Sequence, residues 1–315
     1  MQATLRRFGF QAMGSPCELQ FYSDSTIEAK KASRRLAAEV VRLEKKYSRF
    51  LRDSYLTAIN YSAGDSLGIR LDSETYRLLE HALACFEESE GLFDITSAPL
   101  AQLWDFRNAR VPTQAQIDSA LEHIGFHRLN WKKSRLHLPA GMSIDLGGIV
   151  KEYAADAVAS NARRLGITHG LVNLGGDFAV IGPKPDDSPW PVGIVDPRKP
   201  DTLMAKINLG SGGIASSGDY ARCFEHEGKR YSHIINPKTG WPCEGLRAVS
   251  VAANLSTVAG SMATIAMLKS RDAGIKYLKD SGLPHVYMTQ EEDVGGEGLA
   301  PLAAAQTATD EQATA

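Results

Sequence analysis

Short strand-like runs concentrated in the second half of the chain constrain its fold more than any other feature. Runs rich in β-branched and other apolar residues, bounded by turn residues, occur at 16–22, 169–181, 191–195, 204–209, 230–235, 246–253 and 284–288. Apolar residues at helical spacing predict helices at 26–47, 75–90, 114–124, 151–165 and 256–269. Because helices and strands do not alternate as in repeated β-α-β units, the pattern predicts a mixed α+β fold.

Composition excludes several classes of protein. Of the 315 residues, 35 are Lys or Arg and 37 are Asp or Glu, so nucleic acid and anionic membrane are not expected as the main partners. No run approaches the about 18 apolar residues of a membrane span, and residues 1–17 lack the apolar core of a signal peptide. Four cysteines without a CxxC pair predict reduced thiols, so we expect a cytoplasmic protein.

The last residues differ in composition from the rest. Residues 296–315 are poor in large apolar side chains, whereas no linker-like stretch occurs before about residue 290. We therefore expect one domain at 1–295, followed by a disordered tail at 296–315.

The stretch "IDLGGIVKEYAADA" (144–157) raises a question about Asp145 and Lys151, which flank two glycines just before a predicted helix. Either the two side chains form a local ion pair that caps the helix, or the turn holds a charged ligand. The start of a helix offers free N–H groups and a positive dipole end, which favour a phosphate.

Familiar catalytic motifs fail on inspection. "EGKRY" (227–231) is similar to the end of a P-loop, but Cys223 stands where Gly is required and Arg230 where Ser or Thr is required. Arg230 also takes the place of the second histidine of a zinc-binding HExxH motif. No GxSxG or GxGxxG sequence is present, so a serine-hydrolase elbow and a Rossmann dinucleotide site are not expected.

What remains is a set of clusters that combine glycine with charged or polar residues. They are "AMGS" (12–15), "GLFDIT" (91–96), "DLGGIVK" (145–151), "NLGGD" (173–177), "SSGDY" (216–220) and "SHIINPKTG" (232–240). Each alone is more simply a turn. Together they favour a ligand site, because ligand groups gather where loops meet at one edge of a sheet.

In order along the chain, these clusters resemble the ApbE family, the FAD:protein FMN transferases. The resemblance extends from Met13 to about residue 290 and includes "YSRFLRDSYLTAIN" (47–60) and "SVAANLSTVAGSMATIAML" (250–268). It implies a T-fold-like architecture of mixed, largely antiparallel sheets with packed helices. It also implies an enzyme that binds FAD with Mg²⁺, cleaves the pyrophosphate, and attaches FMN to a Thr or Ser hydroxyl of an acceptor flavoprotein with release of AMP.

The resemblance also implies roles for individual residues. Positions matching FAD contacts are Met13, Phe50, Asp94, Asp145, Lys151 and His233. The backbone carbonyl of Gly148 and the side chain of Thr264 match metal ligands. Lys151 and His233 match catalytic positions, and a neutral histidine can take the proton of an acceptor hydroxyl. Further matches to recurrent family positions are Asn60, Asp177, Asp219 and Thr239.

One departure from the family pattern concerns the metal. "AGSMAT" (259–264) has Gly260 where the family typically has an Asp ligand, and Glu152 stands where Gly is common. Glu152 either supplies a substitute carboxylate or favours the helix N-terminus through its charge, and the second is the simpler expectation. Two further functions therefore stay open: a non-catalytic FAD-binding carrier or regulator, and a metal-dependent FAD pyrophosphatase. The retained Asp145, Lys151, Thr264 and His233 favour a catalytic role, whereas Gly260 favours the non-catalytic carrier.

Overall fold

An eight-stranded sheet forms the centre of the protein, whose computed structural model describes residues 3–132, 134–220 and 222–299. The strand order is β1-β2-β6-β7-β10-β13-β14-β15, and every neighbouring pair is antiparallel. These strands are β1 (Thr4–Ala12), β2 (Ser15–Ser23), β6 (Gly170–Leu174), β7 (Asp177–Gly182), β10 (Gly213–Gly218), β13 (Leu246–Ala253), β14 (His285–Thr289) and β15 (Val294–Glu297). The mixed, largely antiparallel α+β fold expected from the sequence is confirmed.

Three small sheets complete the strand inventory of the described residues. They are β3-β5-β4, β8-β9 and β11-β12, and all their pairs are antiparallel. Their strands are β3 (Ile69–Arg70), β4 (Asn130–Lys132), β5 (Arg135–His137), β8 (Trp190–Asp196), β9 (Lys199–Leu209), β11 (Cys223–His226) and β12 (Lys229–Ser232).

The predicted helices are all present. The helices are α1 (Thr26–Tyr47), α2 (Tyr55–Tyr61), α3 (Ser73–Glu88), α4 (Ala98–Leu103), α5 (Gln114–Leu121), α6 (Val150–Arg164), α7 (Ser256–Leu268) and α8 (Arg271–Ser281). Two 3₁₀ turns lie at Ile95–Ser97 and Phe126–Arg128. The sequence analysis missed α2, α4 and α8, of which the first two are too short to establish a helical period.

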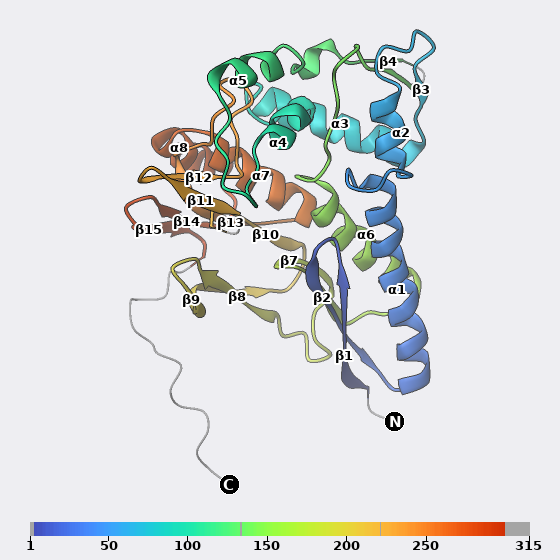
Figure 1. Ribbon diagram of the computed structural model, residues 1–315. Helices are drawn as coiled ribbons and strands as arrows, with labels where there is room; N and C mark the ends of the chain where they lie inside the picture. Colours follow the sequence, from blue (N-terminus) through green and yellow to red (C-terminus); the bar gives the residue numbers. More distant parts are fainter. Residues whose placement is uncertain (1–2, 133, 221, 300–315) are drawn as a thin grey trace.

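Both faces of the central sheet are covered (Figure 1). On one face α6 and α7 lie against the central strands, and α1 packs against α6 and β1. The α6 surface facing this core is made of small residues, including Ala154, Ala155 and Ala159, which let the helix approach its neighbours closely. On the other face the β8–β9 hairpin places Trp190 and Val192 against the sheet.

One predicted strand, 169–181, is wrong as a single element. Gly175 and Gly176 both have positive φ, at 63° and 98°, and form a two-residue turn that splits the run into β6 and β7. Such turns need two left-handed residues, which glycine provides without steric cost. The cluster "NLGGD" is therefore a hairpin whose second strand begins with Asp177.

Ordered structure continues past residue 295, the expected end of the domain. Strand β15 continues to Glu297, and Leu299 is buried against the β8–β9 side of the sheet. A single large apolar side chain thus holds residues that their composition assigned to a tail. The remainder of the expected tail, 300–315, lies outside the described residues.

Candidate functional site

The turn at 144–149 is held from three directions before α6 begins. The Asn60 side chain donates to the Ile144 carbonyl (3.0 Å) and accepts from the Ile144 N–H (2.8 Å). The Asp145 N–H donates to the Ile95 carbonyl (2.8 Å), and the Asp145 carboxylate accepts from the Gly147 N–H (2.9 Å). The turn is thereby fixed while Gly147 and Gly148 stay exposed.

The start of α6 is not capped by a side chain. Ile149 occupies the N-cap position and its side chain has no hydrogen-bonding group for the first-turn N–H groups. The Ile149 and Val150 N–H groups donate to the Leu146 carbonyl (3.0 Å each), so this 15-residue helix presents the later N–H groups of its first turn and the positive end of its dipole next to the exposed glycine turn.

Asp145 and Lys151 do not form the local ion pair that the sequence left open. Asp145 pairs with Arg49 at 3.0 Å, and Lys151 pairs with Asp177 at 2.9 Å, although neither contact has the angle of a good hydrogen bond. Each charge is thus matched by a distant segment: the end of α1 for Asp145, and the β6–β7 hairpin for Lys151.

Lys151 keeps its charge in this setting. Burial alone would lower the pKa of the Lys151 ammonium, but the adjacent Asp177 carboxylate outweighs burial and raises that pKa. Asp177 is 1% exposed and also accepts a hydrogen bond from the Ser216 N–H at 3.3 Å. The Lys151 side chain as a whole is 31% exposed, so a ligand can approach it while the ammonium remains paired with Asp177.

Glu152, the next residue, is buried between α6 and α7. It is 7% exposed, and its Oε2 atom has no hydrogen-bond partner. Burial, with a further contribution from the negative charge of Asp177, raises the pKa of Glu152 to about 8. A Cβ atom at Gly260 would lie 2.6 Å from Cγ of Glu152 and 2.7 Å from its Oε1, so the glutamate side chain fills the space that a residue 260 side chain would enter.

Thr264 lies one helical turn beyond Gly260 on α7. Its hydroxyl is 2.9 Å from the hydroxyl of Ser217 on β10, the neighbour of Ser216, which bonds Asp177. The Thr264–Ser217 pair and the Asp177–Lys151 pair are thus joined through the β10 backbone, where Ser216 and Ser217 are adjacent.

His233 follows β12 at the surface. Its Nδ1 atom is 3.2 Å from the Arg222 carbonyl, a contact that requires the proton on Nδ1 and leaves the Nε2 lone pair free. Surrounding protein desolvates the ring and lowers the pKa of His233 below its usual 6.5. The ring is therefore neutral at pH 7 and can accept a proton.

The β11–β12 hairpin that carries His233 is fixed by an ion pair. Arg230 donates to both carboxylate oxygens of the buried Asp219, at 2.6 and 2.9 Å. The next residue, Tyr220, lies over Gly218, where any Cβ would collide with its ring. Asp219 is thus a structural anchor, which separates it from the residues that remain open to a ligand.

The predicted FAD contacts Phe50 and Met13 lie in two different segments. Phe50 is 77% exposed, and the Arg49 guanidinium that pairs with Asp145 is 4.9 Å from its ring centre. Met13 lies in the β1–β2 turn at φ 51°, with its N–H bonded to the Glu44 carboxylate (2.8 Å).

Asp94 has its hydrogen bonds within the fold. Its oxygens accept from the Thr96 N–H and hydroxyl (2.8 and 2.6 Å) and from the Phe126 N–H (3.0 Å). It thereby shapes the segment whose Ile95 carbonyl holds Asp145. Its role in the structure is to support the turn.

The sequence analysis missed Arg49 and Ser217 as parts of this site. Arg49 lies next to Phe50 in "YSRFLRDSYLTAIN" (47–60), and Ser217 lies in "SSGDY" (216–220). Their partners, Asp145 and Thr264, are distant in the sequence, so no local pattern marks them.

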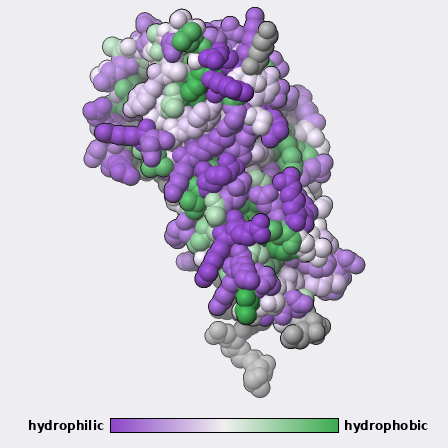
Figure 2. Space-filling model, turned by 90° about the vertical axis from the view of Figure 1, so that its right-hand side faces the viewer, coloured by the Kyte–Doolittle hydropathy of each residue, from purple (hydrophilic) through white to green (hydrophobic). Residues whose placement is uncertain are grey.

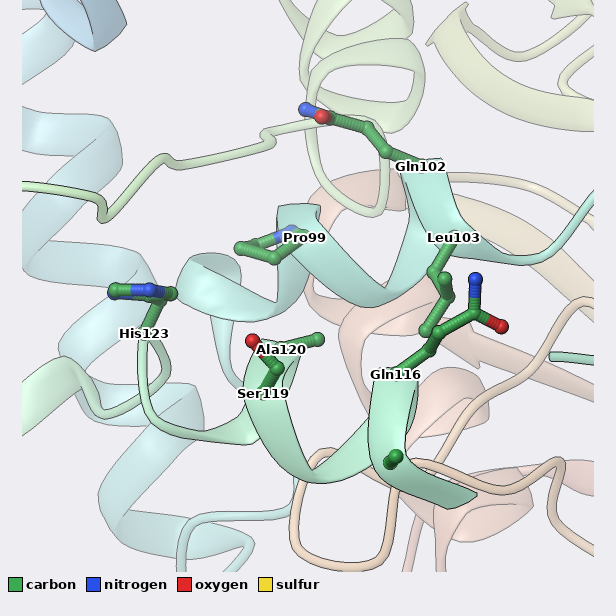
Figure 3. A pocket seen from close by; sticks show the side chains of 8 residues that line it. Pro99, Gln102, Leu103, Gln116, Ser119, Ala120 and His123 are labelled. Atoms are coloured by element: carbon green, nitrogen blue, oxygen red, sulfur yellow. The ribbon is translucent and has the colours of Figure 1, made fainter. Parts of the chain in front are cut away.

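A hollow elsewhere on the surface does not compete with this site. It lies between α4 and α5, where Gln102, Gln116 and His123 are among the lining residues (Figure 3). None of the predicted site residues lines it, and it contains no carboxylate or lysine. The face of the molecule seen in Figure 2 is mostly hydrophilic, with hydrophobic residues in small separate groups.

Two features are absent from the described part of the chain. Residues 3–132, 134–220 and 222–299 contain no group of three or more His, Cys, Asp and Glu side chains arranged to hold a metal. Among the same residues, no helix combines the length and the apolar character needed to cross a bilayer.

Comparison with known proteins gives consistent matches. The sequence model of the ApbE family matches residues 13–287. The FAD:protein FMN transferase of Haemophilus influenzae is 28% identical over 302 residues, covering 90% of this chain and 86% of that protein. That of Salmonella typhimurium is 32% identical over 265 residues, covering 80% and 74%.

Solved structures agree with the fold. The ApbE protein of Thermotoga maritima has a TM-score of 0.87 at 30% identity, over 94% of this chain and 97% of that one. The apo flavinyl transferase ApbE of Pseudomonas stutzeri has a TM-score of 0.84 at 27% identity, over 95% and 96%.

Proposed function

The chain belongs to the ApbE family, and we propose that it is an FAD:protein FMN transferase that attaches FMN to a Thr or Ser hydroxyl of an acceptor flavoprotein. The relatives whose names carry this activity span most of the chain. The single observation that carries the proposal is the position of Lys151. Its charged side chain, which is partly exposed, lies at the start of α6 beside a glycine turn, which suits a pyrophosphate.

The residues divide between binding and chemistry. Phe50, exposed beside Arg49, offers a ring face on which an isoalloxazine can stack. Lys151 and the α6 N–H groups bind the pyrophosphate oxygens and stabilise the charge that develops on them. Met13 and Asp145 border the same turn region, and Asp145 holds Arg49 in place.

His233 acts on the acceptor. Its free Nε2 takes the proton of the acceptor hydroxyl as the oxygen attacks the phosphorus on the FMN side of the pyrophosphate. The bond from that phosphorus to the bridging oxygen breaks, and AMP leaves with the bridging oxygen. The products are the FMN phosphoester of the acceptor and AMP.

The residues present suit a hard divalent cation. Glu152 Oε2 is a buried carboxylate oxygen without a hydrogen-bond partner, and the Thr264 hydroxyl and Gly148 carbonyl are neutral oxygen donors. Mg²⁺ typically uses one or two carboxylates together with substrate phosphates, so a cluster of three acidic side chains is not required. Mg²⁺ held there would offset the negative charge of the pyrophosphate.

Incubation with FAD, Mg²⁺ and a candidate acceptor protein tests the proposal. We expect flavin fluorescence that stays with the acceptor in a denaturing gel, together with one AMP for each flavin attached. An acceptor with its target Thr changed to Val is the matched control. Release of AMP and free FMN without labelling would identify a pyrophosphatase instead. Binding of FAD with no cleavage would identify a carrier.

A further inference from the structure

We propose that Glu152 is the carboxylate ligand of the divalent cation in this chain, and that Gly260 is glycine because it makes room for it. The inference deepens the proposed function and rests on it for the identity of the phosphate-bearing substrate. It concerns the contact between α6 and α7, where the two residues meet.

Residues 152 and 260 compete for the same space between α6 and α7. A Cβ on residue 260 would lie 2.6 Å from Cγ, 2.7 Å from Oε1 and 2.9 Å from Cδ of Glu152, closer than real Cβ atoms approach other atoms. A side chain at 260 and a glutamate at 152 therefore cannot both occupy this contact as it stands. One carboxylate fits there, and in this chain it is carried by α6 instead of α7.

Ionised Glu152 is costly to bury at this contact. Glu152 is only 7% exposed, and its Oε2 atom has no hydrogen-bond partner. A buried carboxylate with an unpaired oxygen is unfavourable unless a cation or donor compensates it. The positive end of the helix dipole explains an acidic residue in the first turn, but the same benefit is available to an exposed side chain.

Lys151, the lysine next to Glu152, is paired with another carboxylate. The carboxylates of Glu152 and Asp177 lie near one another, and Lys151 supplies a single ammonium, which is paired with Asp177. The nearby Asp156 is committed elsewhere, because it accepts from the Ser256 and Thr257 N–H groups at the start of α7. Without a further cation, the raised pKa of Glu152 keeps its carboxyl largely protonated, and a divalent cation at the α6–α7 contact would favour the ionised form that can act as a ligand.

Manganese binding tests this assignment without relying on catalysis. Mn²⁺ affinity would be measured by electron paramagnetic resonance with FAD present, and melting temperature would be measured with and without Mg²⁺. We expect Glu152→Gln to weaken Mn²⁺ binding at least tenfold and to abolish the Mg²⁺-dependent rise in melting temperature, while riboflavin affinity is unchanged. Glu28→Gln, an exposed first-turn glutamate of α1, is the matched control and should change neither.

Reciprocal exchange gives the second test. Gly260→Asp alone should lower the melting temperature, because its Cβ collides with Glu152. The double variant Glu152→Gly/Gly260→Asp should restore both the melting temperature and Mn²⁺ affinity to within about threefold of the parent. Parental Mn²⁺ binding in Glu152→Gln, or a double variant no better than Gly260→Asp, would overturn the assignment.

The outcomes separate this inference from the proposed function. If Mn²⁺ binding depends on Glu152 but no acceptor is flavinylated, the ligand assignment stands and the transferase proposal fails. If transfer occurs and Glu152→Gln retains full Mn²⁺ binding, the transferase proposal stands and the ligand assignment fails.

Discussion

Replacing Lys151 by methionine should destabilise the protein through the partner that it leaves behind. Methionine keeps most of the aliphatic stem, so the change reports on the charge. The ammonium is 2.9 Å from the Asp177 carboxylate, which at an effective dielectric constant of about 20 corresponds to a gross attraction of about 6 kcal/mol. Desolvation offsets part of this. Removing one partner of a buried pair costs about 3–5 kcal/mol, and because the lysine side chain is 31% exposed we expect about 3 kcal/mol.

The expected loss is measurable by urea unfolding or by a fall in melting temperature of about 6–12 °C. Lys151→Met/Asp177→Asn should recover about 2 kcal/mol of it, because the Asn oxygen still accepts from the Ser216 N–H while the unpaired charge is gone. A single variant that loses less than about 1 kcal/mol, or a double variant no more stable than the single, would refute this account of the pair.

The same two variants separate stability from ligand binding. Both should bind riboflavin like the parent and FAD at least tenfold more weakly, because only FAD carries the pyrophosphate that Lys151 contacts in the proposed complex. Fluorescence quenching titrations measure both affinities. Recovery of FAD affinity in the double variant would mean that Lys151 acts on the ligand only by holding the fold.

Three further results are expected. The chain should bind FAD more tightly than FMN or riboflavin in flavin quenching titrations, and equal affinities would contradict a pyrophosphate site. His233→Ala should abolish transfer with FAD affinity intact. In the parent protein, the transfer rate should fall on acidification with a midpoint below pH 6.5, because desolvation lowers the pKa of His233. A midpoint above pH 6.5 would exclude His233 as the base. Burial would raise the pKa of Glu74, but Arg42 and Lys46 outweigh it and lower that pKa from 4.5 to about 2. Glu74 should therefore add stability above pH 4.5 that is lost as the pH falls toward 2. In urea unfolding, we expect Glu74→Gln to cost about 1–2 kcal/mol at pH 7 and progressively less below about pH 5. A stability difference that does not change with pH would contradict this.

The sequence predicts this fold well where a period is long enough to read. The helix expected at 26–47 matches α1 at both ends, and the strand expected at 246–253 matches β13. The run at 169–181 was read as one strand because two glycines do not interrupt its apolar character, although their positive φ values turn the chain. Strand β1 was missed because its charged and apolar residues, such as Arg6 and Phe8, give no more than a weak alternation.

The candidate site was predictable as a set of segments, but not as a set of contacts. The glycine clusters correctly marked the turn before α6 and the β6–β7 hairpin, because turns require particular residues wherever they occur. The side-chain pairs within the site could not be predicted in this way. Asp145 meets Arg49 and Lys151 meets Asp177 only after the sheet and helices are assembled. No rule about neighbours in sequence could have ruled out the local pairing of Asp145 with Lys151.

Glu152 shows how a local rule fails when a distant residue decides the environment. An acidic residue in the first turn of a helix is favourable by itself, and on that rule the side chain would face solvent. Gly260, more than a hundred residues later, opens a space on α7 that the glutamate side chain fills, and the carboxylate is buried. From sequence alone, an aspartate at 260 would be expected simply to add a metal ligand. In the structure its Cβ collides with Glu152, so the effect of either residue depends on the other, and substitutions at 152 and 260 should be strongly non-additive.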